Sequence, residues 1–180
     1  MKFQKLTLVA LSLLFLSAST CFDQDDKDKL PPETQSGRNT FGCLVNGKVW
    51  LPKSTPFSSV GTLAHLNEDY THLIIAGNQS GNQIISFFIN NTIIETGSVF
   101  NLSSDENSKA HFDYYNCYYR SYNENPGELI ITKFDTVNKI VSGRFYFTAK
   151  YFESSINSYN CDNSFIITEG RFDLTYSIQL

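Results

Sequence analysis

Hydrophobic and polar residues alternate strictly near the C-terminus, over residues 171–178. Apolar side chains take every second position and polar side chains the positions between, so that Phe172, Leu174, Tyr176 and Ile178 alternate with Arg171, Asp173, Thr175 and Ser177. A period of two residues is typical of a β-strand with one face buried and one face in water. This segment therefore predicts a half-buried strand.

Similar patterns continue through the chain after residue 40. Runs rich in β-branched and aromatic residues predict further strands over Tyr70–Ala76, Gln83–Ile89, His111–Tyr122, Glu128–Phe134, Ile140–Phe152 and Phe165–Thr168. Asp135–Asn138 and Glu169–Gly170 are expected to be the turns of two hairpins. After residue 20, no stretch of eleven residues shows the 3.6-residue period of a helix. We expect residues 41–180 to form a single all-β domain, either an antiparallel β-sandwich or a barrel-like sheet.

The dipeptide Asn46-Gly47 predicts a tight turn between Phe41–Val45 and Lys48–Leu51. Asparagine and glycine accept the positive φ angles of a type I′ turn, whose twist matches that of paired strands. The expected register sets Cys43 opposite Trp50 and Leu44 opposite Val49. Trp50 is expected to be buried beside this hairpin.

The first twenty residues have the organisation of an export signal. A basic start is followed by the apolar run Leu6–Leu16 and by the small residues Ser17–Thr20. The run is too short for a transmembrane helix, which needs about twenty apolar residues. Cys21 then stands where bacterial lipoproteins carry their lipidated cysteine. We expect residues 1–20 to be removed and Cys21 to be acylated; an ordinary cleaved signal peptide is the alternative.

The segment 21–40 is nearly free of apolar residues and is expected to be a flexible acidic tether. Asp23, Asp25 and Asp26 follow directly after the lipidated cysteine. This acidic cluster resembles the sorting signal that sends Bacteroidota lipoproteins to the outer surface. The resemblance implies a protein anchored in the bacterial outer membrane and exposed at the cell surface.

Charge restricts the partners that the domain can have. The full chain carries 14 basic and 18 acidic side chains, and removal of residues 1–20 lowers the formal charge from −4 to −6. A net acidic chain without a basic stretch argues against nucleic acid as a partner. The expected partners are the membrane, through the lipid anchor, and a glycan or an envelope protein; no cofactor is expected.

Four segments of the predicted domain share a pattern with known lipoproteins. They contain N-G-K-V-W, G-E-L-I-I-T, S-G-R-F-Y-F and I-T-E-G-R-F-D, and lie within Asn39–Trp50, Gly127–Thr132, Ile140–Phe147 and Ile167–Asp173. Together they resemble a family of Bacteroidota lipoproteins of unknown function over most of residues 39–178. The resemblance implies a β-rich, exported, membrane-tethered domain and brings no catalytic residues. The segment Tyr114–Tyr119 departs from the family's pattern.

Residues for catalysis or metal binding form no recognisable motif. His65 and His72 could face one another across a hairpin, but their spacing is looser than that of known metal-ligand motifs, and His111 has no matching partner. The G-x-S-x-G motif of serine hydrolases is absent. Gly77–Asn82 is rich in glycine but lies between two predicted strands, so we interpret it as a turn. We therefore expect neither a metal site nor an enzyme.

The aromatic run His111–Tyr122 has a different character. If it is one strand, Phe112, Tyr114, Tyr118 and Tyr122 share one face, while Tyr115, Cys117 and Tyr119 share the other. A central strand, or one covered by a loop, would bury both faces. The alternative is an exposed platform of Tyr114, Tyr118 and Tyr122 that binds sugar rings or a partner protein.

Three cysteines remain after the lipidated one: Cys43, Cys117 and Cys161. Cysteines of exported proteins tend to pair, and an odd number leaves at least one without an intramolecular partner. Cys43 and Cys161 lie in the family-like segments, so the resemblance favours a Cys43–Cys161 disulfide. A Cys117–Cys161 disulfide and three buried thiols are the alternatives.

The tripeptide Asp135-Thr136-Val137 resembles the O-glycosylation acceptor of Bacteroides-type bacteria. It falls on a predicted loop, which a glycosyltransferase can reach, and makes Thr136 a candidate for modification.

The sequence therefore predicts a surface lipoprotein whose β domain is a non-catalytic binding or accessory module for a glycan or a protein partner. A structural envelope lipoprotein without a ligand is the alternative, and a hydrolase is the less favoured one.

Overall fold

A computed structural model describes residues 29–53, 61–80, 82–103, 107–124, 126–152 and 160–179 of the chain. These residues contain twelve strands: β1 (Thr40–Val45), β2 (Lys48–Trp50), β3 (Thr62–Asn67), β4 (Leu73–Gln79), β5 (Gln83–Ile89), β6 (Val99–Leu102), β7 (Ser108–Tyr114), β8 (Cys117–Ser121), β9 (Gly127–Asp135), β10 (Ile140–Tyr151), β11 (Ser164–Thr175) and β12 (Ser177–Gln179). The described part of the chain forms no helix long and apolar enough to span a membrane.

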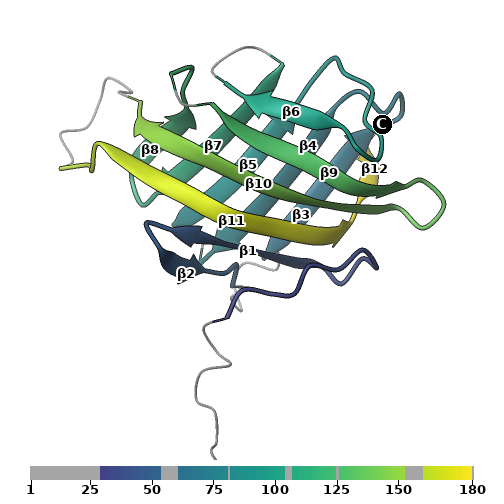
Figure 1. The fold of residues 1–180 in the computed structure, drawn as a ribbon, viewed down its shortest axis with the longest axis horizontal. Coiled ribbons are helices and arrows are strands. Elements are labelled where there is room, and N and C mark those ends of the chain that lie inside the picture. The colour runs from purple at the N-terminus through teal and green to yellow at the C-terminus, as the bar shows by residue number, and fades with distance from the viewer. Residues whose placement is uncertain are drawn as a thin grey trace, which may run out of the picture.

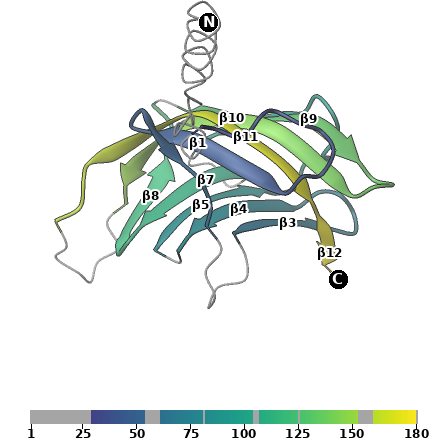
Figure 2. The same cartoon turned by 90° about the horizontal axis from the view of Figure 1, so that it is seen from below.

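The twelve strands form one continuous sheet that folds over itself into two layers (Figures 1 and 2). The front layer has the order β6-β9-β10-β11-β1-β2, and the back layer has the order β12-β3-β4-β5-β7-β8. The long strand β10 joins them, because Ile140–Tyr146 pairs with β9 and Ala149–Tyr151 pairs with β8. The sheet is not closed into a barrel. The predicted all-β class is confirmed, and its sandwich-like form is the one found.

Apolar side chains from both layers meet in a shared core. The Phe87 ring on β5 lies 4.7 Å from the Phe145 ring and 5.8 Å from the Phe147 ring, both of which belong to β10. Phe41 continues this aromatic contact from Phe145 to Trp50 at the front edge. Trp50 is buried, as expected. The β10 rings thus hold the two layers together. Figure 1 shows that the strands of the two layers cross.

The first hairpin has the predicted geometry. Asn46 and Gly47 have φ angles of 48° and 75°, and the register pairs Cys43 with Trp50 and Leu44 with Val49. Asn46 Oδ1 also accepts a hydrogen bond of 2.8 Å from the backbone N–H of Ile166. The turn residue therefore ties the hairpin to β11 as well as reversing the chain.

Two of the predicted connections differ in the structure. The run His111–Tyr122 is not one strand but the hairpin β7–β8, which turns at Tyr115 with a φ of 54°. No glycine or proline marks this turn, and the aromatic residues around it are typical of strands, so the sequence pattern did not predict it. Glu169–Gly170 is not a turn but a bulge within β11, at which the register with β10 shifts. A Cβ on Gly170 would lie 2.3 Å from the Phe145 ring, which explains why glycine is required there.

Strands β3 and β6 were not predicted. β6 has only four residues, and β3 carries polar residues on the face that is not buried, so neither gives a strong sequence signal.

Residues 31–38, which we call the N-terminal strap, lie against the outer surface of the front layer (Figure 2). A Cβ on Gly42 of β1 would lie 2.7 Å from the Pro31 ring, so the strap packs closely on that strand. Glu33 forms an ion pair with Arg144, and Lys133 Nζ donates a 3.0 Å hydrogen bond to Gln35 O. This part of the segment expected to be a tether therefore belongs to the domain.

The strap closes over Asp173, whose side chain points outward from β11. Although alternation placed this residue on the polar face, it is only 1% exposed. Its carboxylate accepts hydrogen bonds from two hydroxyls and three backbone N–H groups: Thr34 Oγ1 (2.6 Å), Ser142 Oγ (2.8 Å), Gly37 N (2.8 Å), Ser36 N (3.0 Å) and Arg38 N (3.1 Å). Burial alone would raise the pKa of Asp173, but these hydrogen bonds outweigh it and hold the pKa well below its usual value.

Candidate binding site on the β7–β8 hairpin

The residues predicted for lipidation and sorting are Cys21, Asp23, Asp25 and Asp26. All four lie outside the described residues, so their roles stay predictions.

The structure separates the three tyrosines that were expected to form one platform. Tyr118 is 51% exposed and Tyr122 is 42% exposed, and both lie on the outer side of the back layer. Tyr114 packs instead against the core, 5.1 Å from the Phe165 ring, so its expected place in the platform is wrong. The hairpin turn at Tyr115 is the reason, because it reverses the alternation that a single strand would have kept.

Strand alternation determines which side chains of the hairpin face outward. Ala110 and Phe112 of β7 are buried, so the intervening side chains Lys109, His111 and Asp113 face outward. On β8, Tyr118 and Arg120 do the same, since Asp113 pairs with Tyr118 and His111 pairs with Arg120. The outer surface of the hairpin therefore brings basic and aromatic groups together.

The end of β10 supplies the remaining groups. Lys150 pairs with Arg120 across the β8–β10 ladder, and the backbone N–H of Phe152 donates a 2.9 Å hydrogen bond to Tyr118 O. The Arg120 guanidinium carbon lies 3.8 Å from the centre of the Phe152 ring. Lys150 Nζ lies 4.2 Å from the centre of the Tyr122 ring. Each cation is thus held against an aromatic face.

Two neighbouring hollows open on this surface. The larger, of about 420 Å³, is lined by Ser103, Lys109, His111, Arg120, Ser121, Tyr122, Lys150, Tyr151 and Phe152. The smaller, of about 230 Å³, is lined by His111, Asp113, Tyr118, Tyr119, Arg120 and Phe152. Three residues, His111, Arg120 and Phe152, line both. We call this combined region the basic–aromatic site.

Two titratable groups of the basic–aromatic site have shifted pKa values. Burial, with smaller contributions from the Arg120 and Lys109 charges, lowers the pKa of His111 to about 4, so its imidazole is neutral at pH 7. Burial raises the pKa of Asp113, while the Arg120 charge opposes that rise. His111 Nε2 is buried, and no hydrogen-bond partner for it exists among the described residues.

A disulfide joins Cys117 to Cys161, with a Cα–Cα distance of 5.9 Å. The expected Cys43–Cys161 pair is therefore wrong, and the alternative pairing is found. Cys43 on β1 is a free, buried thiol, and burial raises the pKa of this thiol far above its usual value. The disulfide lies next to Tyr118 and ties the start of β8 to the segment that leads into β11.

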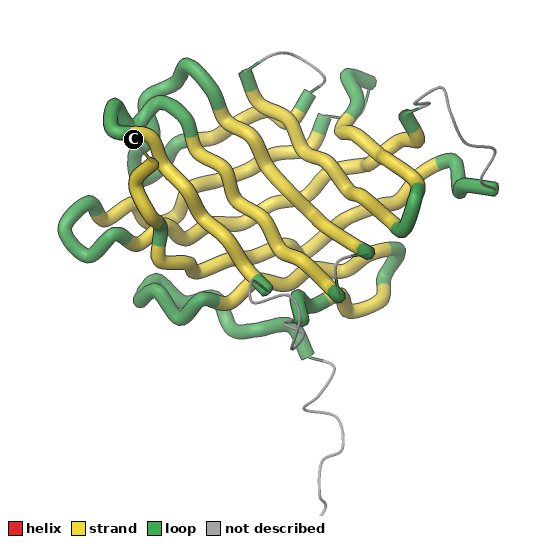
Figure 3. Tube along the Cα trace, turned by 180° about the vertical axis from the view of Figure 1, so that it is seen from behind, coloured by secondary structure: helices red, strands yellow, loops and turns green. Residues whose placement is uncertain are grey.

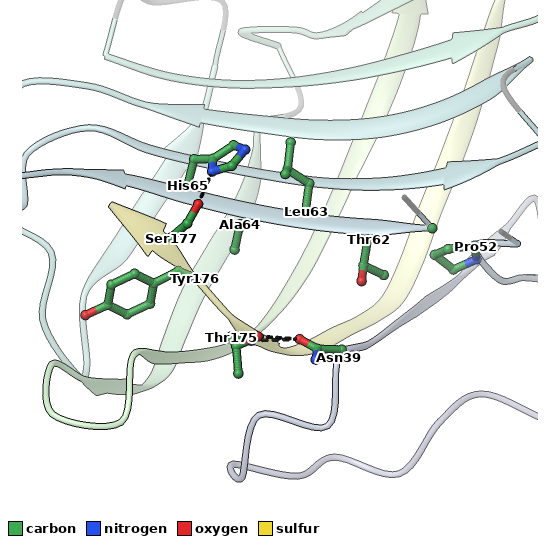
Figure 4. A pocket seen from close by; sticks show the side chains of 10 residues that line it. Asn39, Pro52, Thr62, Leu63, Ala64, His65, Thr175, Tyr176 and Ser177 are labelled. Carbon is green, nitrogen blue, oxygen red and sulfur yellow. Dashed lines mark hydrogen bonds between the residues drawn. The ribbon is translucent and has the colours of Figure 1, made fainter. Parts of the chain in front are cut away.

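A more open hollow, of about 640 Å³, lies where β3 meets β11 and β12 (Figure 4). Here Ser177 Oγ is hydrogen-bonded to His65 Nδ1, and Thr175 donates two 2.9 Å hydrogen bonds to Asn39 Oδ1. A serine next to a histidine resembles part of a hydrolase triad. The residues described as lining this hollow include no carboxylate to orient the histidine, which leaves the pair incomplete as a catalytic unit.

The two histidines considered for a metal site do not face each other. His65 contacts Ser177, whereas His72 Nδ1 lies 3.0 Å from Asn67 Nδ2. In the described part of the chain, no group of three His, Cys, Asp or Glu residues is arranged to hold a metal ion.

Thr136 lies in the exposed turn between β9 and β10, next to Val137, which is 88% exposed. Asp135 stabilises this turn by accepting hydrogen bonds from Asn138 Nδ2 (2.9 Å) and from the Asn138 and Val137 N–H groups. The Asn138 hydrogen bonds lower the pKa of Asp135 to about 2. The position is accessible for modification, which itself stays a prediction.

Sequence reasoning found two of the tyrosines but missed Lys109, Arg120, Lys150 and Phe152. The available signal was one basic residue among aromatic residues in each of the segments 117–122 and 147–152. That signal could be read only after the turn at Tyr115 was known, because the turn decides which residues share a face.

Comparison with protein families places most of the domain in a known group. Residues 52–172, more than half of the chain, match the model of DUF6252, a domain of unknown function. Comparison with curated proteins and with solved structures gives no match. The matched range omits β1 and β2, although the structure pairs β1 with β11, so the folded domain extends beyond it. The chain belongs to the DUF6252 family.

Proposed function

We propose that the protein is a lipoprotein of the bacterial outer membrane, anchored through Cys21 and displayed at the cell surface, whose β domain is a non-catalytic binding module. The anchor and the address rest on the sequence features of residues 1–28. The glycan or partner protein would bind at the basic–aromatic site. A single observation carries this proposal: Tyr118, Tyr122 and Phe152 remain 42–51% exposed together on one surface.

Aromatic rings at such a surface are suited to recognition. A tyrosine ring offers a flat apolar face to a sugar ring or a partner's side chain, and its hydroxyl adds a hydrogen bond at the edge. Large apolar groups that cluster on a surface generally mark an interaction site, whereas isolated ones do not. The clustering of three rings around two cations therefore favours binding over a purely structural role.

The binding proposal is tested with an immobilised panel of glycans and outer-membrane proteins. The wild-type chain should bind at least one member of the panel, and the double variant Tyr118→Ala/Tyr122→Ala should lose that binding while keeping its melting temperature. A control variant, Tyr146→Ala, removes an equally exposed tyrosine from the front layer and should bind normally. A chain that binds no member, or a double variant that binds as well as wild type, would favour the structural alternative.

The anchor and address are tested in cells. Cys21→Ala should abolish palmitate labelling and leave an unprocessed precursor; unchanged labelling would refute lipidation. Replacement of Asp23, Asp25 and Asp26 by Ala should protect the protein from protease added to intact cells. If the variant stays as sensitive as wild type, the sorting signal lies elsewhere.

A further inference from the structure

The charge of the basic–aromatic site is opposite to that of the whole chain. The chain has a formal charge of −4, yet Lys109, Arg120 and Lys150 all line the larger hollow, and none of the residues described as lining it is acidic. Lys150 pairs with Glu124 at 3.1 Å, on the exposed side of the site. Lys109 and Arg120 form no ion pair within the described parts of the chain. Among the described residues, the nearest carboxylate to Arg120 that interacts with it is Asp113 in the adjoining hollow, so the larger hollow itself keeps an excess of positive charge.

An aromatic contact orients one of these cations, Arg120. Because Phe152 covers one face of the Arg120 guanidinium, the N–H groups at its edge stay available. A guanidinium edge matches a planar carboxylate, to which it donates two parallel hydrogen bonds. Stacking on the ring also reduces the rotational freedom that Arg120 would otherwise lose on binding. The arrangement is thus prepared to receive an anion.

The remaining groups of the site favour a polyhydroxyl ligand over a bare anion. His111 lines both hollows and is neutral at pH 7, so it adds no further positive charge to the site. In the smaller hollow, Asp113 and Tyr118 provide groups that can accept hydrogen bonds from hydroxyls. Tyr122 and Phe152 line the larger hollow, each with a cation against one face of its ring. A sugar presents the hydroxyls and the apolar ring face that this combination needs.

We propose that the basic–aromatic site binds an acidic saccharide, whose carboxylate contacts Arg120 and Lys109 and whose neighbouring sugar ring lies against the aromatic side chains. This inference rests on the proposed function, since it names the ligand class of the same site. The volume of the larger hollow, about 420 Å³, falls within the usual range of small-ligand sites. The adjoining smaller hollow gives room for a second sugar unit.

The test uses two acidic saccharides, each with a neutral counterpart of the same rings. Trigalacturonate is compared with its methyl ester, and sialyllactose with the methyl ester of its sialic acid carboxylate, by isothermal titration calorimetry on the full chain in detergent. Tripolyphosphate serves as an anion without sugar rings. At least one acidic saccharide should bind, with its neutral counterpart and tripolyphosphate at least about tenfold weaker, as expected for loss of a charged hydrogen-bond pair.

Two variants connect that binding to the site. Arg120→Gln should weaken the acidic saccharide about tenfold and abolish the preference over its neutral counterpart. Arg38→Gln removes an exposed arginine from the opposite side of the molecule and should leave the affinity unchanged. Both side chains are exposed, so both variants should keep the wild-type melting temperature.

Each other outcome overturns a stated part of the inference. Equal affinity for the acidic and the neutral saccharide would refute the selection for a negative charge, but not the proposal that the domain is a binding module. If tripolyphosphate binds as tightly as the saccharides, the proposal that the site recognises a sugar ring would be refuted. Failure of both acidic saccharides to bind would end the inference, whereas the proposed function is decided separately by the tyrosine variants on the broader panel.

Discussion

The two outer surfaces of the sandwich differ in whether a buried polar group is hydrogen-bonded by the chain. On the front layer, the strap covers Asp173 and supplies most of the five donors that its carboxylate accepts. On the back layer, which Figure 3 shows from behind, no described residue provides a hydrogen bond to His111 Nε2. Buried polar groups in folded proteins are nearly always hydrogen-bonded. The front surface is thus covered by a segment of the chain itself, whereas no described segment covers the hairpin surface on the back layer in this way.

The largest expected effect concerns the completed surface. Asp173→Ala removes the acceptor for five hydrogen bonds and should lower the free energy of unfolding by about 3–5 kcal/mol, as loss of a buried charged partner does. Urea denaturation measures this loss. Asp135→Ala, at an exposed turn, is the matched control and should have a much smaller effect. Equal losses in the two variants would mean that the strap does not stabilise the fold.

A chain shortened to begin at Asn39 tests the same contacts by removing the strap instead of Asp173. It lacks the Thr34, Ser36, Gly37 and Arg38 donors but retains Asp173, whose carboxylate is then opened to water and keeps Ser142 as the remaining donor of the five. This chain should be destabilised about as much as Asp173→Ala, and the two changes combined should add little further. Full additivity, measured by urea denaturation, would show that the strap and Asp173 act independently.

The disulfide bears on the open surface. Reduction of Cys117–Cys161, which closes a loop of 44 residues, should cost about 2–4 kcal/mol. It should also weaken ligand binding, because the disulfide adjoins Tyr118. Non-reducing peptide mapping and thermal melts with and without reductant measure both effects. Cys43→Ala, which removes the free thiol, is the control that should keep binding intact; a reduced protein with unchanged affinity would contradict the link between disulfide and site.

Acid should affect the two surfaces in different pH ranges. His111 has a folded pKa of about 4, below its ordinary value of about 6.5, so the unfolded chain binds the proton first. Its contribution to stability is complete above about pH 6.5 and is lost as the pH falls toward 4. Asp173 also has a lowered pKa, and its contribution is lost only below about pH 4–5.

The pH dependence of the unfolding free energy separates these contributions. His111→Gln should flatten the curve between about pH 6.5 and 4, and Asp173→Asn should flatten it only at lower pH. A His111→Gln curve that parallels wild type throughout the upper range would show that this histidine keeps its ordinary pKa.

The smallest expected effect is at the exposed rings. Tyr118→Ala/Tyr122→Ala should change the unfolding free energy by less than about 1 kcal/mol, because surface substitutions generally do. Tyr119→Ala, one residue away but 1% exposed, should cost about 3–5 kcal/mol. Thermal melts of the two variants therefore give a direct contrast between a ligand surface and the core. A large loss in the double variant would remove the argument for a binding surface.

Local patterns predicted the parts of the fold that local chemistry decides. Asn46-Gly47 gave both the turn and the register of the first hairpin. The alternation over residues 171–178 was read as one strand, but it spans the break at Tyr176 between β11 and β12. The turn at Tyr115 escaped, because aromatic residues surround it and no glycine or proline marks it. The disulfide was assigned to the wrong partner for a related reason, since the β7–β8 hairpin is what places Cys117 near Cys161.

Long-range contacts set the limit of prediction at both surfaces. Asp173 looks like an ordinary exposed residue in its strand, and its strap partners lie 135–139 residues earlier in the chain. The basic–aromatic site combines β7, β8 and the end of β10, which meet only after the sheet has folded. Alternation predicts which side of one strand is polar, but not which segment will cover it.

The docked strap also determines how the domain would be oriented at a membrane. Pro31 is fixed against β1 on the front surface, so any anchor at Cys21 pulls on that side of the sandwich. The ten residues from Cys21 to Pro31 can extend at most about 36 Å. If the protein is anchored at Cys21, the tether would leave the domain on its front layer, and the basic–aromatic site would lie on the opposite surface. The strap would thus fix the point at which the tether leaves the domain, on the side away from the basic–aromatic site.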